Sequence, residues 1–199
     1  FGFKTNDYVV LYSGAIGEKQ GLEAILYAAK TLTFYPNLKF VICGTGPYKE
    51  VLKNKAERMQ LQNLIFLPLQ PKEDFNAFLN MADLHLVIQK EKASDLVMPS
   101  KLTTILAVGG LALITANAQS TLHQVVRKFQ MGLLVAAEDQ EALNEGILKA
   151  YQDTDRQQGL MQSVIWPSIT LCRRLMIAYT FEFFTLSLHH INQACRISI

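Results

Sequence analysis

The sequence has few cysteines, little net charge and no long uncharged apolar run, and each shortage excludes a class of protein. Its three cysteines are odd in number and have no metal-ligand spacing, which argues against a disulfide framework or a metal site. A net charge of +2 without a basic block argues against nucleic-acid binding. No uncharged apolar run reaches the length that spans a bilayer, and no signal peptide is present. We therefore expect a protein of the reducing cytoplasm.

What the sequence does contain is an alternation of short apolar runs with helix-like segments. The runs are rich in β-branched and aromatic residues, which is typical of strands buried on both faces. The strands are predicted at 8–13, 38–43, 64–67, 84–88, 111–115 and 132–136. The helices are predicted at 22–32, 48–60, through 75–79, between Pro99 and the glycine pair 109–110, at 120–129 and at 139–151. This alternation predicts the α/β class: a doubly wound, open, parallel, six-stranded, Rossmann-like sheet.

The composition changes near residue 152. Lysines are frequent up to Lys149 and absent from 151–199, where apolar residues and threonine dominate. We therefore divide the chain into a Rossmann-like domain at 1–151 and an apolar appendage at 152–199. A helix that packs on another domain is the favoured interpretation of the appendage. A membrane-surface segment beside Arg173 and Arg174, or sequence unrelated to the fold, are the alternatives. Because the sequence begins at Phe1, we expect it to be part of a longer protein.

The segment 94–115 carries the most specific local feature. Pro99 suits a first helical turn, Ser100 offers a capping hydroxyl, and the glycine pair at 109–110 can end a helix. Lys101 then places a cation in the first turn, where the helix dipole disfavours it by roughly 0.3–1 kcal/mol. An anion at this helix start would remove the conflict, so we interpret the segment as a phosphate site. A lysine that reaches sideways into solvent is the alternative.

A second lysine is predicted at the same edge of the sheet. The glycine-rich turn 14–21 follows the first strand, and Lys19 lies at the start of the predicted helix. Carboxyl ends of parallel strands meet at one edge, where ligands bind. Two lysines at two helix starts suit a diphosphate, which has two anionic centres. A nicotinamide-dinucleotide site is disfavoured, because Gly-x-Gly-x-x-Gly does not follow the first strand.

Other candidate residues carry weaker signals. Asp95 precedes the predicted phosphate site, where a loop carboxylate could accept hydrogen bonds from sugar hydroxyls; a solvated aspartate is the alternative. His85 alternates within an apolar strand and is interpreted as a core histidine with a satisfied hydrogen bond. No Ser–His–Asp arrangement can be assembled with any specificity.

Five motifs in order resemble the C-terminal, donor-binding half of group 1 (family four) glycosyltransferases of the GT-B fold. The resemblance runs from Tyr8 to about Tyr151 and is strongest to the colanic-acid type of exopolysaccharide enzymes. The motifs are Tyr12-Ser-Gly-Ala-Ile-Gly-Glu-Lys-Gln-Gly21, Gly44-Thr-Gly-Pro47, Phe66-Leu-Pro-Leu-Gln-Pro71, Met81-Ala-Asp-Leu-His-Leu86 and Asp95-Leu-Val-Met-Pro-Ser-Lys-Leu-Thr103.

The resemblance implies a retaining, metal-independent transferase that takes a nucleotide-diphosphate sugar as donor and needs no cofactor. It implies that a glycan or lipid-linked acceptor binds to an N-terminal domain that this chain lacks, with peripheral contact at the inner face of the plasma membrane. The diphosphate would lie between the turn 14–21 and Ser100-Lys101, and the base would meet the backbone at Leu69. The implied donor-binding residues are Gly14, Gly17, Lys19, Gln20, Gly44, Gly46, Leu69, Ser100, Lys101 and Thr104.

Charged positions of the family are altered in the turn 14–21. Ala15 stands where many relatives carry an arginine, and Gln20 stands where they carry a lysine. Lys19 is interpreted as a replacement shifted by one position.

Two glutamates of many relatives are also replaced. Thr104 can still hydrogen-bond a ribose hydroxyl, but Leu96 cannot contact a sugar through a charge, which leaves Asp95 or Glu91 for that role. We therefore expect the isolated chain to bind a donor without transferring it. A non-catalytic nucleotide-binding or protein-docking module is the alternative, and a sugar-nucleotide epimerase follows from fold analogy alone.

Overall fold

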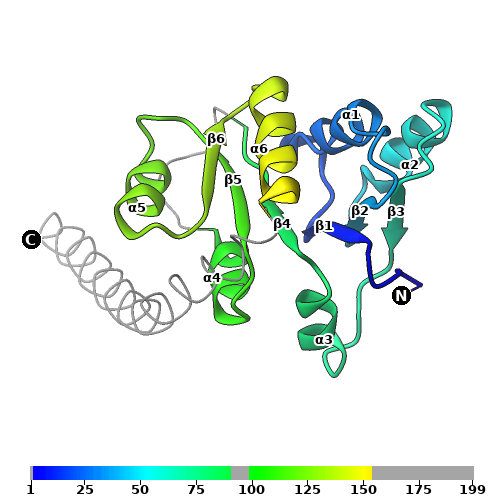
Figure 1. Cartoon of the computed structure of the whole chain (residues 1–199), viewed down its shortest axis with the longest axis horizontal. Coiled ribbons are helices and arrows are strands. Elements are labelled where there is room, and N and C mark those ends of the chain that lie inside the picture. The colour runs from blue at the N-terminus through cyan, green and yellow to red at the C-terminus, as the bar shows by residue number, and fades with distance from the viewer. Residues whose placement is uncertain (1, 91–98, 154–199) are drawn as a thin grey trace, which may run out of the picture.

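In a computed structural model of the chain, residues 2–90 and 99–153 are described. Six parallel strands form one open sheet in the order β3-β2-β1-β4-β5-β6 (Figure 1). The strands are β1 (Tyr8–Ser13), β2 (Leu38–Cys43), β3 (Leu64–Leu67), β4 (Leu84–Val87), β5 (Ala112–Ala116) and β6 (Leu133–Ala136). The helices are η1 (Glu18–Gln20), α1 (Glu23–Thr31), α2 (Lys49–Arg58), α3 (Phe75–Asn80), α4 (Ser100–Ala107), α5 (Thr121–Phe129) and α6 (Gln140–Gln152).

The centre of the sheet is β1, which pairs with β2 along its whole length from Tyr8 opposite Leu38 to Ser13 opposite Cys43. On its other side β1 pairs with β4, so the strand order reverses between these two strands. In doubly wound sheets such a reversal opens a crevice at the carboxyl ends of the strands, where ligands bind. The predicted fold class is confirmed.

Helices cover both faces of the sheet, which is why the strands are apolar throughout rather than alternating. On one face, residues of α1, α2 and α6 share a core with Tyr8, Val10 and Tyr12 of β1. On the other face, residues of α3 pack with Val9 and Leu11, while α4 and α5 pack with β5. Figure 1 shows α1, α2 and α6 together above the sheet and α3 and α4 below it.

Two of the predicted helices begin at capping side chains. The hydroxyl of Ser120 accepts a hydrogen bond from the N–H of His123 at 3.1 Å, and the carboxylate of Asp139 accepts one from Ala142 at 2.9 Å. These caps satisfy backbone donors that have no partner inside the helix. Gly109 adopts a left-handed φ of 73° just after α4, as predicted for the glycine stop.

Cys43 and His85 are both buried in the core. The thiol of Cys43 donates to the carbonyl of Pro68 at 3.0 Å, and burial raises its pKa, so it is a buried free thiol. His85 is only 2% exposed, and burial lowers its pKa to about 4. Its Nε2 has no hydrogen-bond partner among the described residues, so the expectation of a fully satisfied histidine is only partly right.

No helix of the described residues is long and apolar enough to cross a membrane. The predicted appendage 152–199 lies outside the described residues, apart from the end of α6 at Gln152 and the following Asp153.

Candidate functional site

The β1–α1 loop, residues 14–21, forms the centre of the site. The β2–α2 loop holds it in place: Gly14 donates to the carbonyl of Cys43, and Ile16 donates to that of Thr45, both at 2.9 Å. The two loops touch at Gly44 and Gly46. A Cβ on Gly44 would lie 1.9 Å from the carbonyl oxygen of Gly14, and one on Gly46 would lie 2.0 Å from that of Ile16. These glycines therefore support the site by letting two backbones meet.

A pocket of about 350 Å³ lies at the carboxyl ends of β1, β2 and β3, and we call it the Lys101 pocket. It brings together half of the donor-binding residues that the resemblance implies, although they come from separate parts of the chain. Leu69 is 61% exposed at its edge. Its lining is Ser13, Gly14, Ala15, Cys43, Leu69, Gln70, Phe75, Leu79, Ser100, Lys101, Thr104 and Ile105.

Lys101 has an unusual electrostatic environment in this pocket. Its ammonium lies 3.5 Å from the centre of the Tyr12 ring, and a Cβ on Gly14 would be 3.1 Å from its nitrogen. Burial lowers the pKa of Lys101 from 10.5 to about 7. No carboxylate of the described residues forms an ion pair with it. The ring offsets only part of the lost hydration, so an anion in the pocket would stabilise this cation.

The start of α4 differs from the prediction in one respect. Pro99 is the N-cap and Ser100 is the first helical residue, and no side chain of the described residues caps this end. The predicted capping hydroxyl of Ser100 is therefore wrong. Instead, the hydroxyls of Thr103 and Thr104 donate back to the carbonyl of Ser100, at 2.7 and 3.1 Å. The first-turn N–H groups consequently have no capping side chain in the part of the chain that is described.

Lys19 is not in the Lys101 pocket. It is exposed on η1, a 3₁₀ turn of three residues, and α1 begins only at Glu23. The prediction that Lys19 stands at an α-helix start is therefore wrong. A one-turn helix also has no appreciable macrodipole, so the position of Lys19 does not call for an anion. Gly17 is the N-cap of η1, and a Cβ there would lie 2.6 Å from Oε1 of Gln20.

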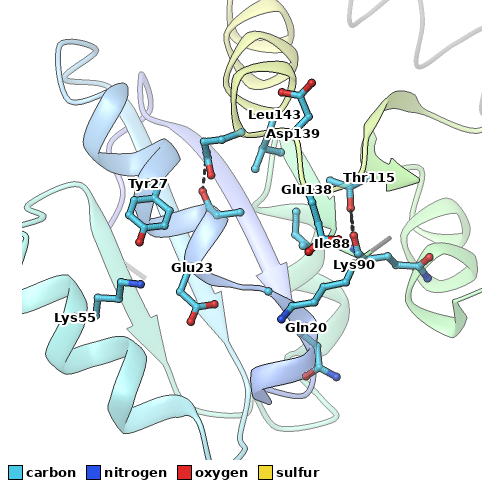
Figure 2. A pocket seen from close by; sticks show the side chains of 14 residues that line it. Gln20, Glu23, Tyr27, Lys55, Ile88, Lys90, Thr115, Glu138, Asp139 and Leu143 are labelled. Atoms are coloured by element: carbon cyan, nitrogen blue, oxygen red, sulfur yellow. Dashed lines mark hydrogen bonds between the residues drawn. The ribbon is translucent and has the colours of Figure 1, made fainter. Parts of the chain in front are cut away.

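A second pocket, of about 380 Å³, lies on the opposite face of the sheet, and we call it the Lys90 pocket (Figure 2). Gln20 lines it, so the β1–α1 loop has one pocket beside its first residue and another beside its last. Sequence reasoning missed Lys90, although a basic residue just after a strand was a usable signal. The lining is Gln20, Gly21, Glu23, Ala24, Tyr27, Lys55, Ile88, Gln89, Lys90, Thr115, Glu138, Asp139, Gln140 and Leu143.

The structure thus separates the predicted site residues. Gly14, Leu69, Ser100, Lys101 and Thr104 share the Lys101 pocket, and Gln20 lines the Lys90 pocket. Gly44 and Gly46 pack against the loop, while Gly17 and Lys19 line neither of these two pockets. Asp95 lies outside the described residues, as do Glu91 and Leu96.

An open doubly wound sheet with pockets at its carboxyl edge defines a Rossmann-like α/β domain. The model of the family "Glycosyl transferases group 1" matches residues 1–163. A colanic acid biosynthesis glycosyl transferase of Escherichia coli, WcaI, is 48% identical over 146 residues, covering 73% of this chain and 36% of that protein. The chain therefore belongs to the group 1 glycosyltransferase family.

Two further comparisons agree with this assignment. The UDP-glycosyltransferase TURAN of Arabidopsis thaliana is 29% identical over 109 residues, which cover 54% of this chain and 23% of that protein. WaaG, a glycosyltransferase involved in lipopolysaccharide biosynthesis, superposes with a TM-score of 0.69 at 20% identity over 85% of this chain and 44% of its own. The fold is one half of a GT-B glycosyltransferase. The chain spans about a third or less of the length of these curated relatives.

Proposed function

We propose that this chain is the donor-binding domain of a glycosyltransferase and binds a nucleotide-diphosphate sugar in the Lys101 pocket. The observation that carries the proposal is the partly buried ammonium of Lys101, which has no counter-charge among the described residues and lies beside Gly14. A diphosphate would supply that charge and would also meet the uncapped N-terminus of α4.

The remaining lining of the pocket suits the nucleoside. Leu69 and Phe75 are apolar, partly exposed and suited to contact the face of a base, and the backbone at Leu69 can hydrogen-bond its edge. Thr104 lies one helical turn after Ser100 and can reach a ribose hydroxyl once its own hydroxyl turns away from the Ser100 carbonyl. Uracil is the first base to test, because TURAN is named a UDP-glycosyltransferase.

The transfer itself needs a second domain in this proposal. A glycan or lipid-linked acceptor would bind there, and the glycosyl group would be transferred with retention, without a metal, in exopolysaccharide synthesis like that of WcaI. Bringing donor and acceptor together supplies most of the catalysis in such a reaction. The isolated chain should therefore bind donor and transfer little or none. A lipid-linked acceptor would place the protein at the cytoplasmic face of the membrane.

Calorimetry and thermal unfolding with UDP, GDP and ADP, and with their glucose conjugates, test the proposal. A ligand present at a hundred times its Kd should stabilise the native chain by about 2.7 kcal/mol, because it binds only the folded state. If no nucleotide at millimolar concentration produces heat or raises Tm, the proposal is wrong. That result would favour the alternative of a docking module, which the replacement of a sugar-side glutamate by Leu96 already suggests.

Donor binding should weaken as the pH rises from 6 to 8.5. The free chain holds Lys101 with a pKa of about 7, and a bound diphosphate would raise that pKa, so binding takes up a proton above neutrality. Near pH 8.5 only about 3% of the free lysine is charged, and affinity should fall roughly tenfold or more. The neighbouring groups do not interfere, because burial raises the pKa of Tyr12 to about 12 and also raises that of Cys43.

Calorimetry with UDP-glucose measures this effect without a titrating ligand, because its diphosphate is esterified at both ends. The matched control is Lys101→Arg, whose guanidinium stays charged across this range and should give a flat pH profile. An equally steep profile in the arginine variant would assign the pH dependence to another group.

A further inference from the structure

The proposed diphosphate has two anionic centres, but only one of the two lysines predicted to bind it lines the Lys101 pocket. Lys101 lies beside Gly14, at the first residue of the β1–α1 loop. Lys19 is exposed on η1 and lines neither the Lys101 pocket nor the Lys90 pocket. A cation near the last residue of this loop would complete the pair.

We propose that Lys90 is this second cation and that it binds the sugar-bearing phosphate of the donor; the inference rests on the function proposed above. Lys90 follows β4 by three residues. Because β4 is the neighbour of β1 where the strand order reverses, the loop after β4 and the β1–α1 loop flank the crevice in which ligands of this fold bind.

Gly21 holds the side chain of Lys90 in place. A Cβ on Gly21 would lie 3.1 Å from Cε and 3.3 Å from Cγ of Lys90, so the lysine stem lies directly across this glycine. Gly21 also adopts a left-handed φ of 68°, which a residue with a side chain adopts only with strain. Since packing already restricts the lysine stem, less rotamer entropy is lost when its ammonium binds a ligand.

The ammonium of Lys90 is available to a ligand. Figure 2 shows the Lys90 side chain pointing toward Gln20, whose buried Oε1 has no hydrogen-bond partner among the described residues. The described residues place no carboxylate in ion-pair contact with Lys90. Three acidic residues line the pocket: Glu23 accepts a hydrogen bond from the hydroxyl of Tyr48 at 2.5 Å, Asp139 caps α6, and Glu138 is not without a partner either.

The backbone between the two lysines offers further donors. Within the described part of the chain, the N–H groups of Ala15 and Gly17 have no hydrogen-bond partner, whereas those of Gly14 and Ile16 bind the β2–α2 loop. Free N–H groups of a turn form a favourable site for an anion. A diphosphate across this loop would have Lys101 at one end, Lys90 at the other and free N–H groups between them.

The test compares nucleoside diphosphates with monophosphates, because only the diphosphate has a second centre for Lys90. Calorimetry of the 199-residue chain with UDP, GDP and ADP selects the tightest of the three, and its monophosphate is measured alongside. The variant Lys90→Met should bind the diphosphate roughly tenfold more weakly and the monophosphate unchanged. Lys90→Arg should restore most of the diphosphate affinity. The matched control Lys19→Met also removes one positive charge and should leave the affinities for the diphosphate and the monophosphate unchanged.

The outcomes separate this inference from the function on which it rests. Suppose that Lys90→Met and Lys19→Met bind the diphosphate with the same affinity, while Lys101→Met binds both the diphosphate and the monophosphate more weakly. The proposed role of Lys90 is then wrong, and the proposed donor site remains. If Lys90→Met weakens both ligands equally, Lys90 does not distinguish the second phosphate and the inference is again wrong. If neither UDP, GDP nor ADP binds the wild-type chain, the donor site and the inference fall together.

Discussion

Replacing Lys101 with methionine is expected to weaken nucleotide-sugar binding by roughly 1.5–3 kcal/mol, which is about 10- to 150-fold in Kd. The ammonium lies beside Gly14 at the edge of the sheet and has no counter-charge among the described residues, so its interaction with a diphosphate is not shared with a protein carboxylate. Methionine keeps the length and packing of the stem and removes the charge. Calorimetry with the tightest-binding nucleotide sugar at pH 6.5 measures the loss, since most of the lysine is charged there.

The same substitution should stabilise the chain without ligand. Burial lowers the pKa of Lys101 to about 7 in the folded chain, whereas it titrates near 10.5 when solvated, so the charged form opposes folding. This penalty is complete below pH 7 and disappears as the pH rises toward 10.5. Lys101→Met should therefore raise Tm most at or below neutral pH, and the exposed Lys19→Met should leave both Tm and binding unchanged. A variant that loses both stability and binding would show that Lys101 serves packing instead.

Replacing Gly46 with alanine is expected to have the largest effect on stability. The new Cβ would lie 2.0 Å from the carbonyl oxygen of Ile16, and the φ of 157° at Gly46 is one that residues with side chains rarely adopt. Because the contacted atom belongs to the backbone, no side-chain rotation can relieve the overlap. Strain and overpacking together should cost about 2–6 kcal/mol in the free energy of unfolding, measured by urea titration.

A matched control separates the two causes. Gly2 also has a positive φ, of 80°, but a Cβ there would meet nothing within 4 Å. Gly2→Ala should therefore show the cost of a positive φ without a steric contact, about 1 kcal/mol. If Gly46→Ala costs no more than Gly2→Ala, the β1–α1 and β2–α2 loops do not need the close approach that the structure shows. At a temperature low enough for the Gly46→Ala variant to be folded, it should also bind nucleotide more weakly than the wild-type chain, because the loop beside Lys101 would have moved.

Most of the fold followed from local patterns. All six predicted strands form, and their bounds differ from the prediction by at most one residue at either end. A continuous apolar run between two helical segments indicates a strand that is buried on both faces. Strands of a parallel sheet are buried in this way, because helices cover both faces of the sheet. The caps at Ser120 and Asp139 were equally predictable, since a capping side chain and the N–H that it accepts lie within three residues.

Half of the predicted donor-binding residues share one pocket for a related reason. Gly14, Leu69 and Lys101 each lie at or after the carboxyl end of a strand or at the start of the helix that follows. Once a parallel sheet is assumed, all such positions fall on one edge. The loss of the Ser100 cap was not predictable in the same way, because Pro99 shifted the helix start by one residue.

The order of residues along the chain was thus sufficient to predict the sheet and to place Lys101 at its carboxyl edge, because periodicity and helix-start chemistry act within a few residues. Which lysine packs against the last residue of the β1–α1 loop depended on the packed molecule. Lys19 is close to the loop in sequence yet is exposed on a 3₁₀ turn, whereas Lys90 comes from the other side of the reversal point and lies across Gly21. That contact joins two loops far apart in the chain and depends on the absent side chain of a glycine, so no local pattern could have predicted it.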